Sequence, residues 1–323
     1  MSRLSIIVPV YYNADTLEAL YEDLKAKVFA KIPDYEIIFT DDGSGDDSWD
    51  VMNRILKRDR EHVKCVKLSR NFGEHAALFA GLSVCTGDCA VTKQADLQED
   101  SAIIPEMFES WQRGNDVVLA VRNGREDPML KKAAAGLYYK IINRFVDKNM
   151  PVGGCDCYLL DRKVIEVLKI MNEKNSSLTL QVLWAGFKTD RIYFHRDERK
   201  SGKSRWTLAK KVKLALDSMM SFSYFPIRLM TALGFIFALA AIIWIIAVII
   251  EKITVGTPIA GWASLMCLNL FTAGAVMLMV GIIGEYVWRT LDASRSRPPF
   301  IIDRIEDETS KEKKERDIIT CYI

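Results

Sequence analysis

The stretch Glu36-Ile-Ile-Phe-Thr-Asp-Asp-Gly-Ser44 decides the fold of this chain. Its first five residues include β-branched and aromatic side chains, so they predict a buried strand over 36–40. Two aspartates and a glycine follow at once, which is typical of a turn at the end of a strand. On open α/β sheets, ligands bind beyond the carboxyl ends of the strands. The stretch therefore predicts a strand that brings two carboxylates to a ligand site.

Outward from this strand, apolar and amphipathic runs alternate along the first half of the chain. Asp15 is expected to begin a helix with a capping box completed by Glu18. The alternation predicts an α/β fold, with a Rossmann-like, mostly parallel sheet and helices on both faces. We predict further strands at 4–10, 63–68, 89–92 and 116–121, and further helices at 47–57, 74–84, 130–146 and from about Arg162.

Two long stretches near the C-terminal end, Leu229–Ile250 and Trp262–Gly284, contain no charged residue. Each has about 22 residues and as a helix spans ~33 Å, enough to cross the ~30 Å hydrocarbon core of a bilayer. Buried core helices of a soluble protein are the alternative. Two such runs joined by a short linker with glycine and proline are hard to bury in that way. The sequence therefore predicts a transmembrane hairpin.

Basic residues outside the hairpin indicate its orientation. Arg289, Arg295 and Arg297 follow the second stretch, whereas the loop between the stretches holds only Lys252. The positive-inside rule then places the large domain and both termini in the cytoplasm, as in a multi-pass protein of a bacterial inner membrane. Residues 206–224 form a basic amphipathic pattern, which predicts a helix in the bilayer interface, with an ordinary surface helix as the alternative.

The predicted organisation has four parts. These are a catalytic or binding domain over 1–206, an amphipathic region over 207–227, two transmembrane helices within 228–290, and a tail over 291–323 that is disordered toward its end. The net charge of +2 gives no reason to expect a nucleic-acid partner. The seven cysteines show no CxxC spacing, so we expect reduced thiols rather than a metal centre, including at Cys155-Asp156-Cys157.

The segment Gln94-Ala95-Asp96-Leu97-Gln98 follows the strand predicted at 89–92. It carries one carboxylate with amide side chains two residues to either side. Mg²⁺ and Mn²⁺ prefer oxygen ligands, and Mg²⁺ often takes only one or two carboxylates together with substrate phosphates. The segment therefore predicts a divalent-cation site, although a capped turn has a similar sequence.

Several motifs together resemble the GT-A family 2 glycosyltransferases, and among them the polyprenyl-phosphate glycosyltransferases related to dolichyl-phosphate mannose synthase. The resemblance covers the chain to about Arg304, and only the set of motifs is specific. The motifs are Val8-Pro9-Val10-Tyr11, Asp41-Asp42-Gly43-Ser44, Ser69-Arg70-Asn71-Phe72-Gly73, Ala95-Asp96-Leu97-Gln98, Gly284-Glu285-Tyr286 and Arg297-Pro298-Pro299.

The resemblance implies a reaction and a set of site residues. A sugar would move, with inversion, from a nucleotide sugar, preferably a UDP-sugar, to an undecaprenyl or dolichyl phosphate, in a membrane-bound homo-oligomer that uses Mg²⁺ or Mn²⁺. Asp42 would line the pocket for the base and ribose, with Asp41 supporting it. The implied residues are Pro9, Val10, Tyr11, Asn13, Asp41, Asp42 and Gly43 for the donor nucleotide; Asp96, Gln98 and, less certainly, Gln94 for the metal; Asp156 and Arg122 for catalysis; and Lys132, Arg199, Lys203 and Arg205 for the acceptor phosphate.

This chain departs from the family pattern at several places. Gln94 stands where the family usually has aspartate, and Cys157-Tyr158 replaces the usual Phe-Arg. A processive polysaccharide synthase would need glutamine where Gly202 stands. A different lipid acceptor such as diacylglycerol, a guanosine donor, and a non-catalytic nucleotide-sugar-binding protein remain open alternatives, and Asp156 is either the base or an orienting group.

Overall fold

The computed structural model describes residues 2–122, 136, 139–140, 142–144, 146–151, 154–171, 177–194, 217–254 and 261–308. The chain divides into two compact units. The first comprises Met1–Ser218 together with Pro298–Ile323, and the second is Met219–Arg297. The first unit therefore contains segments from both ends of the chain, and the second contains the two uncharged stretches.

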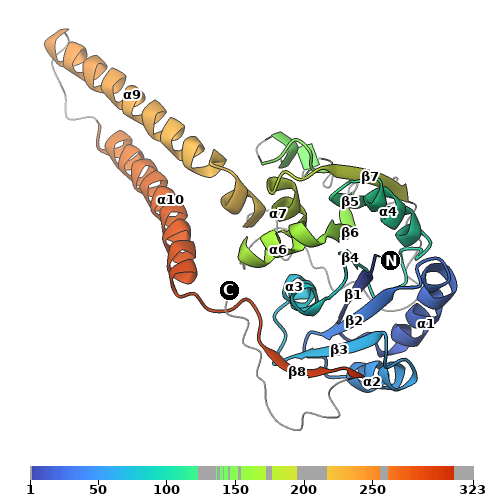
Figure 1. The fold of residues 1–323 in the computed structure, drawn as a ribbon. Coiled ribbons are helices and arrows are strands. Elements are labelled where there is room, and N and C mark those ends of the chain that lie inside the picture. The colour runs from blue at the N-terminus through green and yellow to red at the C-terminus, as the bar shows by residue number, and fades with distance from the viewer. Residues whose placement is uncertain are drawn as a thin grey trace. The chain divides into compact units, whose positions relative to one another are not determined.

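The first unit is built on one eight-stranded sheet with the order β7-β5-β6-β4-β1-β2-β3-β8 (Figure 1). Of these strands, β6 and β8 run antiparallel to their neighbours, and the others share one direction. The predicted mostly parallel sheet is thus confirmed. The strands are β1 (Leu4–Val10), β2 (Tyr35–Asp41), β3 (Val63–Leu68), β4 (Cys89–Thr92), β5 (Val117–Arg122), β6 (Cys155–Asp161), β7 (Thr189–Phe194) and β8 (Ile302–Glu306).

Helices cover both faces of the sheet (Figure 1). Successive strand side chains point to opposite faces, so Ile6 of β1 packs in one core and Ile7 in the other. Gly81 lets its helix lie directly on the sheet, because a Cβ there would stand 2.4 Å from the Ile7 side chain. The helices are α1 (Ala14–Leu24), continued by a π-helical segment (Lys25–Phe29), α2 (Ser48–Arg58) and α4 (Ile103–Gln112) on one face, and α3 (Glu74–Val84), α6 (Arg162–Met171) and α7 (Leu178–Trp184) on the other.

The start of α1 corrects one sequence prediction. The helix begins at Ala14 after Asn13, whose side chain does not cap it, so the capping box expected at Asp15 and Glu18 is wrong. The reason lies in the tertiary structure, because Asn13 is already engaged. Its Oδ1 accepts the N–H of Tyr11 at 3.0 Å, and its own N–H binds the Ser48 hydroxyl at 2.9 Å.

The three strands that the sequence did not predict are β6, β7 and β8. Two of them are edge strands that carry charged residues, and β6 follows a glycine pair. The strand β8 lies within the segment predicted as a tail, and it pairs antiparallel with β3. Phe300, just before it, is buried in the core. Residues 309–323 lie outside the described part of the chain.

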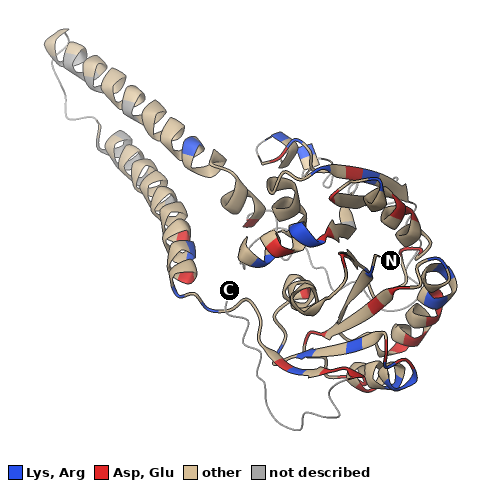
Figure 2. Cartoon of the chain, viewed as in Figure 1, with Lys and Arg blue, Asp and Glu red and all other residues tan. Residues whose placement is uncertain are grey.

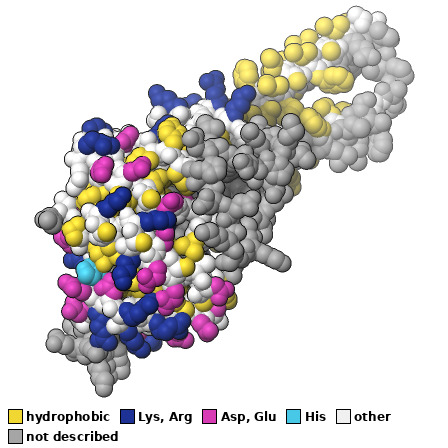
Figure 3. All heavy atoms as spheres, turned by 90° about the vertical axis from the view of Figure 1, so that its right-hand side faces the viewer, with side chains coloured by type: hydrophobic (Ala, Val, Ile, Leu, Met, Phe, Trp, Pro, Cys, Tyr) yellow, Lys and Arg dark blue, Asp and Glu magenta, His cyan; other side chains and the backbone are white. Residues whose placement is uncertain are grey.

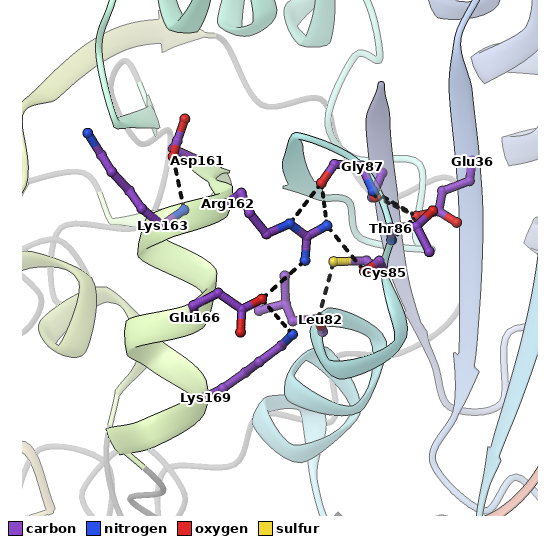
Figure 4. A network of polar contacts seen from close by, with 11 residues as sticks. Glu36, Leu82, Cys85, Thr86, Gly87, Asp161, Arg162, Lys163, Glu166 and Lys169 are labelled. Atoms are coloured by element: carbon purple, nitrogen blue, oxygen red, sulfur yellow. Dashed lines mark hydrogen bonds and ion pairs between the residues drawn. The ribbon is translucent and has the colours of Figure 1, made fainter. Parts of the chain in front are cut away.

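A polar network joins β6 and α6 to the loop before β4, at the sheet edge where β4 begins (Figure 4). The Arg162 guanidinium donates to the carbonyl oxygens of Cys85 and Gly87. On the other side of that loop, Glu36 accepts the backbone N–H groups of Thr86 and Gly87. The network fixes the loop that leads into β4.

The second unit consists of α9 (Phe225–Thr254) and α10 (Trp262–Ser294). Within them, Phe225–Trp244 and Phe271–Ser294 are long and apolar enough to cross a membrane. Their described side chains are largely apolar and exposed (Figure 3). The described charged residues gather at the end of the pair where α9 begins and α10 ends (Figure 2). Of the predicted amphipathic region, residues 207–216 lie outside the described part, and the chain is helical again from 217.

Candidate active site

The topology brings the predicted site residues to one edge of the sheet. Val10 and Asp41 are paired neighbours at the carboxyl ends of β1 and β2, and Asp96 follows β4. Arg122 ends β5. Because β6 runs in the opposite direction, its first residues meet the end of β5, and Cys155 pairs with Val121. The backbone of Asp156 therefore lies at the same edge, while its side chain is outside the described part of the structure.

Asp42 joins the loops that follow β2 and β3. Its two carboxylate oxygens accept the backbone N–H groups of Phe72 at 2.7 Å and Gly73 at 2.9 Å. The loops approach so closely that only glycine fits at position 43, where φ is +68° and a Cβ would lie 2.8 Å from the backbone of Arg70 and Asn71. Both oxygens of Asp42 are thus already used within the protein.

Asp41 has a different environment, although it is also buried. Its Oδ1 accepts the backbone N–H of Ser44 at 3.0 Å, whereas its Oδ2 has no hydrogen-bond partner among the described residues. Burial raises the pKa of the Asp41 carboxyl, and it does the same for Asp42. A buried acceptor without a partner is costly, so a ligand that donates a hydrogen bond would relieve this cost.

Two tyrosines stand beside this acceptor on the loop after β1. Tyr11 and Tyr12 are 38% and 43% exposed, and their rings meet edge to face with centroids 4.8 Å apart. Tyr12 has a left-handed backbone conformation with φ of 56°, and its N–H donates to the Ser44 hydroxyl. The loop thus presents aromatic surface next to the Asp41 carboxylate, an arrangement suited to a nucleobase.

The loop after β4 is held by a buried lysine. Lys93, which is 1% exposed, donates from Nζ to the carbonyl oxygen of Glu99 and so closes the loop that carries Gln94, Asp96 and Gln98. Asp96 Oδ1 accepts the backbone N–H of Gln98 at 3.2 Å. The predicted metal ligands are therefore on a preorganised turn, a feature that their order in the sequence did not reveal.

These residues fit a divalent cation by the chemistry of their donor atoms. Asp96 provides a carboxylate, Gln94 and Gln98 provide amide oxygens, and a diphosphate would provide the rest of a hard oxygen set. The side chain of Gln94 donates from Nε2 to Glu74 Oε1 at 2.7 Å. This second carboxylate, at the start of α3, was not predicted from the sequence, because α3 and β4 meet only in the folded chain.

The predicted acceptor-phosphate residues cannot be placed in this site. Lys132, Arg199, Lys203 and Arg205 lie outside the described residues. Arg122 is described and partly buried at the end of β5.

His75, next to Glu74, is a positioning residue. Its Nδ1 accepts the backbone N–H of Leu178 and so fixes the start of α7. Burial lowers the pKa of this imidazole.

A mostly parallel sheet with carboxylates, tyrosines and an oxygen-rich turn at the carboxyl ends of its strands is typical of nucleotide-binding α/β proteins. Residues 5–169 match the model of glycosyl transferase family 2. The chain belongs to this family, as the sequence resemblance predicted.

Relatives of known name match nearly the whole chain. The uncharacterized glycosyltransferase YkcC of Bacillus subtilis is 34% identical over 94% of this chain and 94% of its own length. The prophage bactoprenol glucosyl transferase homolog of Escherichia coli is 34% identical over 94% and 99%. The bactoprenol glucosyl transferase of Shigella phage SfX is 33% identical over 93% and 98%. With 93–94% of the chain covered, the similarity extends through most of the segments that form α9 and α10.

Proposed function

We propose that this protein transfers a sugar from a nucleotide sugar to a polyprenyl phosphate in a membrane. One observation carries the proposal. The unit that contains the candidate site is followed along the chain by two long apolar helices, after which the chain returns to the same unit as strand β8. The relatives named as bactoprenol glucosyl transferases or homologs of them, which match 93–94% of the chain, support the same acceptor class.

For the donor, we propose that Asp41, rather than Asp42, recognises the base. Its Oδ2 would accept the imide N–H of uracil, while Tyr11 covers one face of the ring. Asp42 would act indirectly, by holding the loop of Phe72 and Gly73 in place. This reverses the roles expected from the sequence alone. Guanine also presents an N–H donor, so UDP- and GDP-sugars both have to be tested. Pro9, Val10, Asn13 and Gly43 shape the two loops of this pocket.

The proposed cation site consists of Asp96 with Gln98 and Gln94, for Mg²⁺ or Mn²⁺. When bound, such an ion supplies Lewis-acid stabilisation of the departing nucleoside diphosphate. The protein's own contribution is positional. Lys93 closes the turn, and the Gln98 N–H orients the Asp96 carboxylate before any substrate arrives.

For the acceptor, an oxygen of the lipid phosphate would attack the anomeric carbon with inversion, and the nucleoside diphosphate would leave. The second pKa of a phosphate monoester is about 6, so at neutral pH most of it is already a dianion. A strong base is then unnecessary, and we propose that Asp156 orients the acceptor. Arg122 would stabilise the phosphate charge, with Lys132, Arg199, Lys203 and Arg205 as further phosphate contacts.

The two apolar helices would anchor the site at the bilayer that contains the lipid acceptor. Since the chain enters α9 from the first unit and re-enters that unit after α10, both ends of the hairpin lie on one side of any membrane that it crosses. The flanking Lys and Arg residues support a cytoplasmic side. We also propose that the protein is a homo-oligomer, which mass photometry of the detergent-solubilised protein can test.

The test is a transfer assay with the purified full-length protein. Radiolabelled UDP- and GDP-sugars are each offered with undecaprenyl phosphate or with diacylglycerol, and lipid-linked product is measured. We expect product only with the polyprenyl phosphate, and an Asp96→Asn variant should lose most of it. Product on diacylglycerol would overturn the proposed acceptor. Donor binding without any transfer would indicate a non-catalytic nucleotide-sugar-binding protein.

A further inference from the structure

Glu74 connects the two halves of the candidate site. It is the first residue of α3 and follows Gly73, whose N–H binds Asp42 on the nucleotide side. Its own Oε1 accepts the side-chain N–H of Gln94, which belongs to the loop of the proposed cation site, at 2.7 Å. Glu74 therefore lies between Gly73, which binds Asp42 on the nucleotide side, and Gln94, which belongs to the loop of the proposed cation site.

The charges around this position are unusual for a cation site. Of the three ligands proposed on the β4 loop, only Asp96 is anionic, because Gln94 and Gln98 are neutral. The buried Lys93 adds a positive charge to the same loop. A divalent cation held by one carboxylate depends heavily on the substrate diphosphate. Glu74 places a second carboxylate within hydrogen-bond distance of Gln94.

Glu74 lies in the first turn of α3, where an acidic side chain stabilises a helix through its charge. A capping side chain would in addition accept backbone N–H groups of that turn. In the described structure no side-chain hydrogen bond caps α3. Besides this place in the helix, Glu74 accepts the Gln94 amide of another loop, and the residue is exposed.

We propose that Glu74 is the second carboxylate of the divalent-cation site, and that the Gln94 amide orients it. The hydrogen bond uses Nε2 of Gln94, so the carbonyl Oε1 of the same side chain stays available as a neutral oxygen ligand beside it. Asp96, Glu74 and Gln94 then give a hard oxygen set in which an aspartate at position 94 is not needed. This inference rests on the proposed function, since it concerns the same donor site.

The experiment measures Mn²⁺ binding directly, by electron paramagnetic resonance titration of the full-length protein with UDP present. The variants are Glu74→Gln, which keeps an acceptor for the Gln94 amide, and Glu106→Gln. Glu106 is a matched control because it is an exposed glutamate in the first turn of α4. UDP affinity without metal and the melting temperature without ligand are measured on each protein.

Glu74→Gln is expected to weaken Mn²⁺ binding by about tenfold or more, on the scale of losing a group that supports a metal ligand. The affinity of Glu74→Gln for UDP without metal should stay within twofold of the parent value, and its melting temperature should be unchanged within error. The control Glu106→Gln should bind Mn²⁺ like the parent protein. Adding Gln94→Glu to Glu74→Gln should restore much of the affinity.

Unchanged Mn²⁺ binding in Glu74→Gln would overturn the inference while leaving the proposed function intact, provided that the parent protein binds Mn²⁺ and transfers sugar. Equal losses of metal-free UDP and Mn²⁺ binding would also overturn it, because Glu74 would then serve the nucleotide or the sugar. A parent protein that binds no Mn²⁺ with UDP would overturn this inference together with the proposed cation site.

Discussion

The contrast between Asp41 and Asp42 gives the sharpest prediction about the donor site. The two residues are adjacent and both are buried, but Asp42 uses both oxygens on the backbone of Phe72 and Gly73, whereas Asp41 keeps Oδ2 without a described partner. Replacing Asp41 by asparagine leaves an acceptor for the Ser44 N–H and places an amide N–H₂ where the base would donate. Replacing Asp42 by asparagine instead puts a donor against one of two backbone donors.

The expected magnitude follows from the hydrogen bond that is lost. A hydrogen bond to a charged group contributes about 1.5–3 kcal/mol. Since about 1.4 kcal/mol is a factor of ten, Asp41→Asn should raise the Kd for UDP by about 10- to 150-fold.

The same substitution should not destabilise the folded protein. Burial raises the pKa of the Asp41 carboxyl in the folded state. The protonated carboxyl therefore favours folding at a pH below the pKa that Asp41 has in the unfolded chain. This contribution is lost as the pH rises through the folded-state pKa. At pH 7 the buried anion therefore opposes folding, and the asparagine relieves this cost.

The assay combines isothermal titration with UDP and hydrogen–deuterium exchange of the loop over 69–73. Asp41→Asn should lose affinity with unchanged exchange and an equal or higher melting temperature. Asp42→Asn should show faster exchange at Phe72 and Gly73 along with any loss of affinity. The reasoning is refuted if Asp41→Asn binds UDP within twofold of the parent, or if Asp42→Asn loses binding while its loop amides stay protected.

Three further predictions concern the framework around the site. Gly43→Ala should lower the stability by about 1–2 kcal/mol from the left-handed backbone alone, and should also separate the two loops, so that calorimetry shows a lower Tm and titration shows weaker UDP binding. Arg162→Met should cost about 2–3 kcal/mol of unfolding free energy in denaturant melts while the KM for donor is unchanged, because its guanidinium binds two backbone carbonyl oxygens. The control Lys163→Met, at an exposed surface ion pair, should leave the denaturation midpoint nearly unchanged. Burial lowers the folded-state pKa of His75, so the unfolded chain takes up a proton at this residue more readily. The stability of the folded protein should therefore fall as the pH drops below about 6.5. A His75→Gln variant should flatten that part of the curve of Tm against pH.

Much of the framework could be predicted because burial leaves a strong local pattern. The strands at 4–10, 63–68 and 89–92 and the helix at 74–84 agree with the structure at both ends. The three strands are largely apolar and each has a neighbouring strand on both sides, and the helix is apolar over most of its length. In contrast, β7 and β8 are edge strands with several exposed or charged residues, so their sequences resemble those of surface segments.

The sequence by itself determined which carboxylates stand at the ends of the strands, that two helices are apolar enough for a membrane, and that the chain resembles family 2 glycosyltransferases. Only the tertiary structure decided which of two adjacent aspartates keeps an oxygen without a described partner, that Glu74 meets Gln94, and that β8 returns to the edge of β3. The physical reason is one of range. Hydrophobic periodicity reflects the positions of near neighbours in the sequence. The hydrogen bonds from Phe72 to Asp42 and from Gln94 to Glu74 join residues that are 30 and 20 positions apart, and they form only when the sheet aligns the ends of its strands.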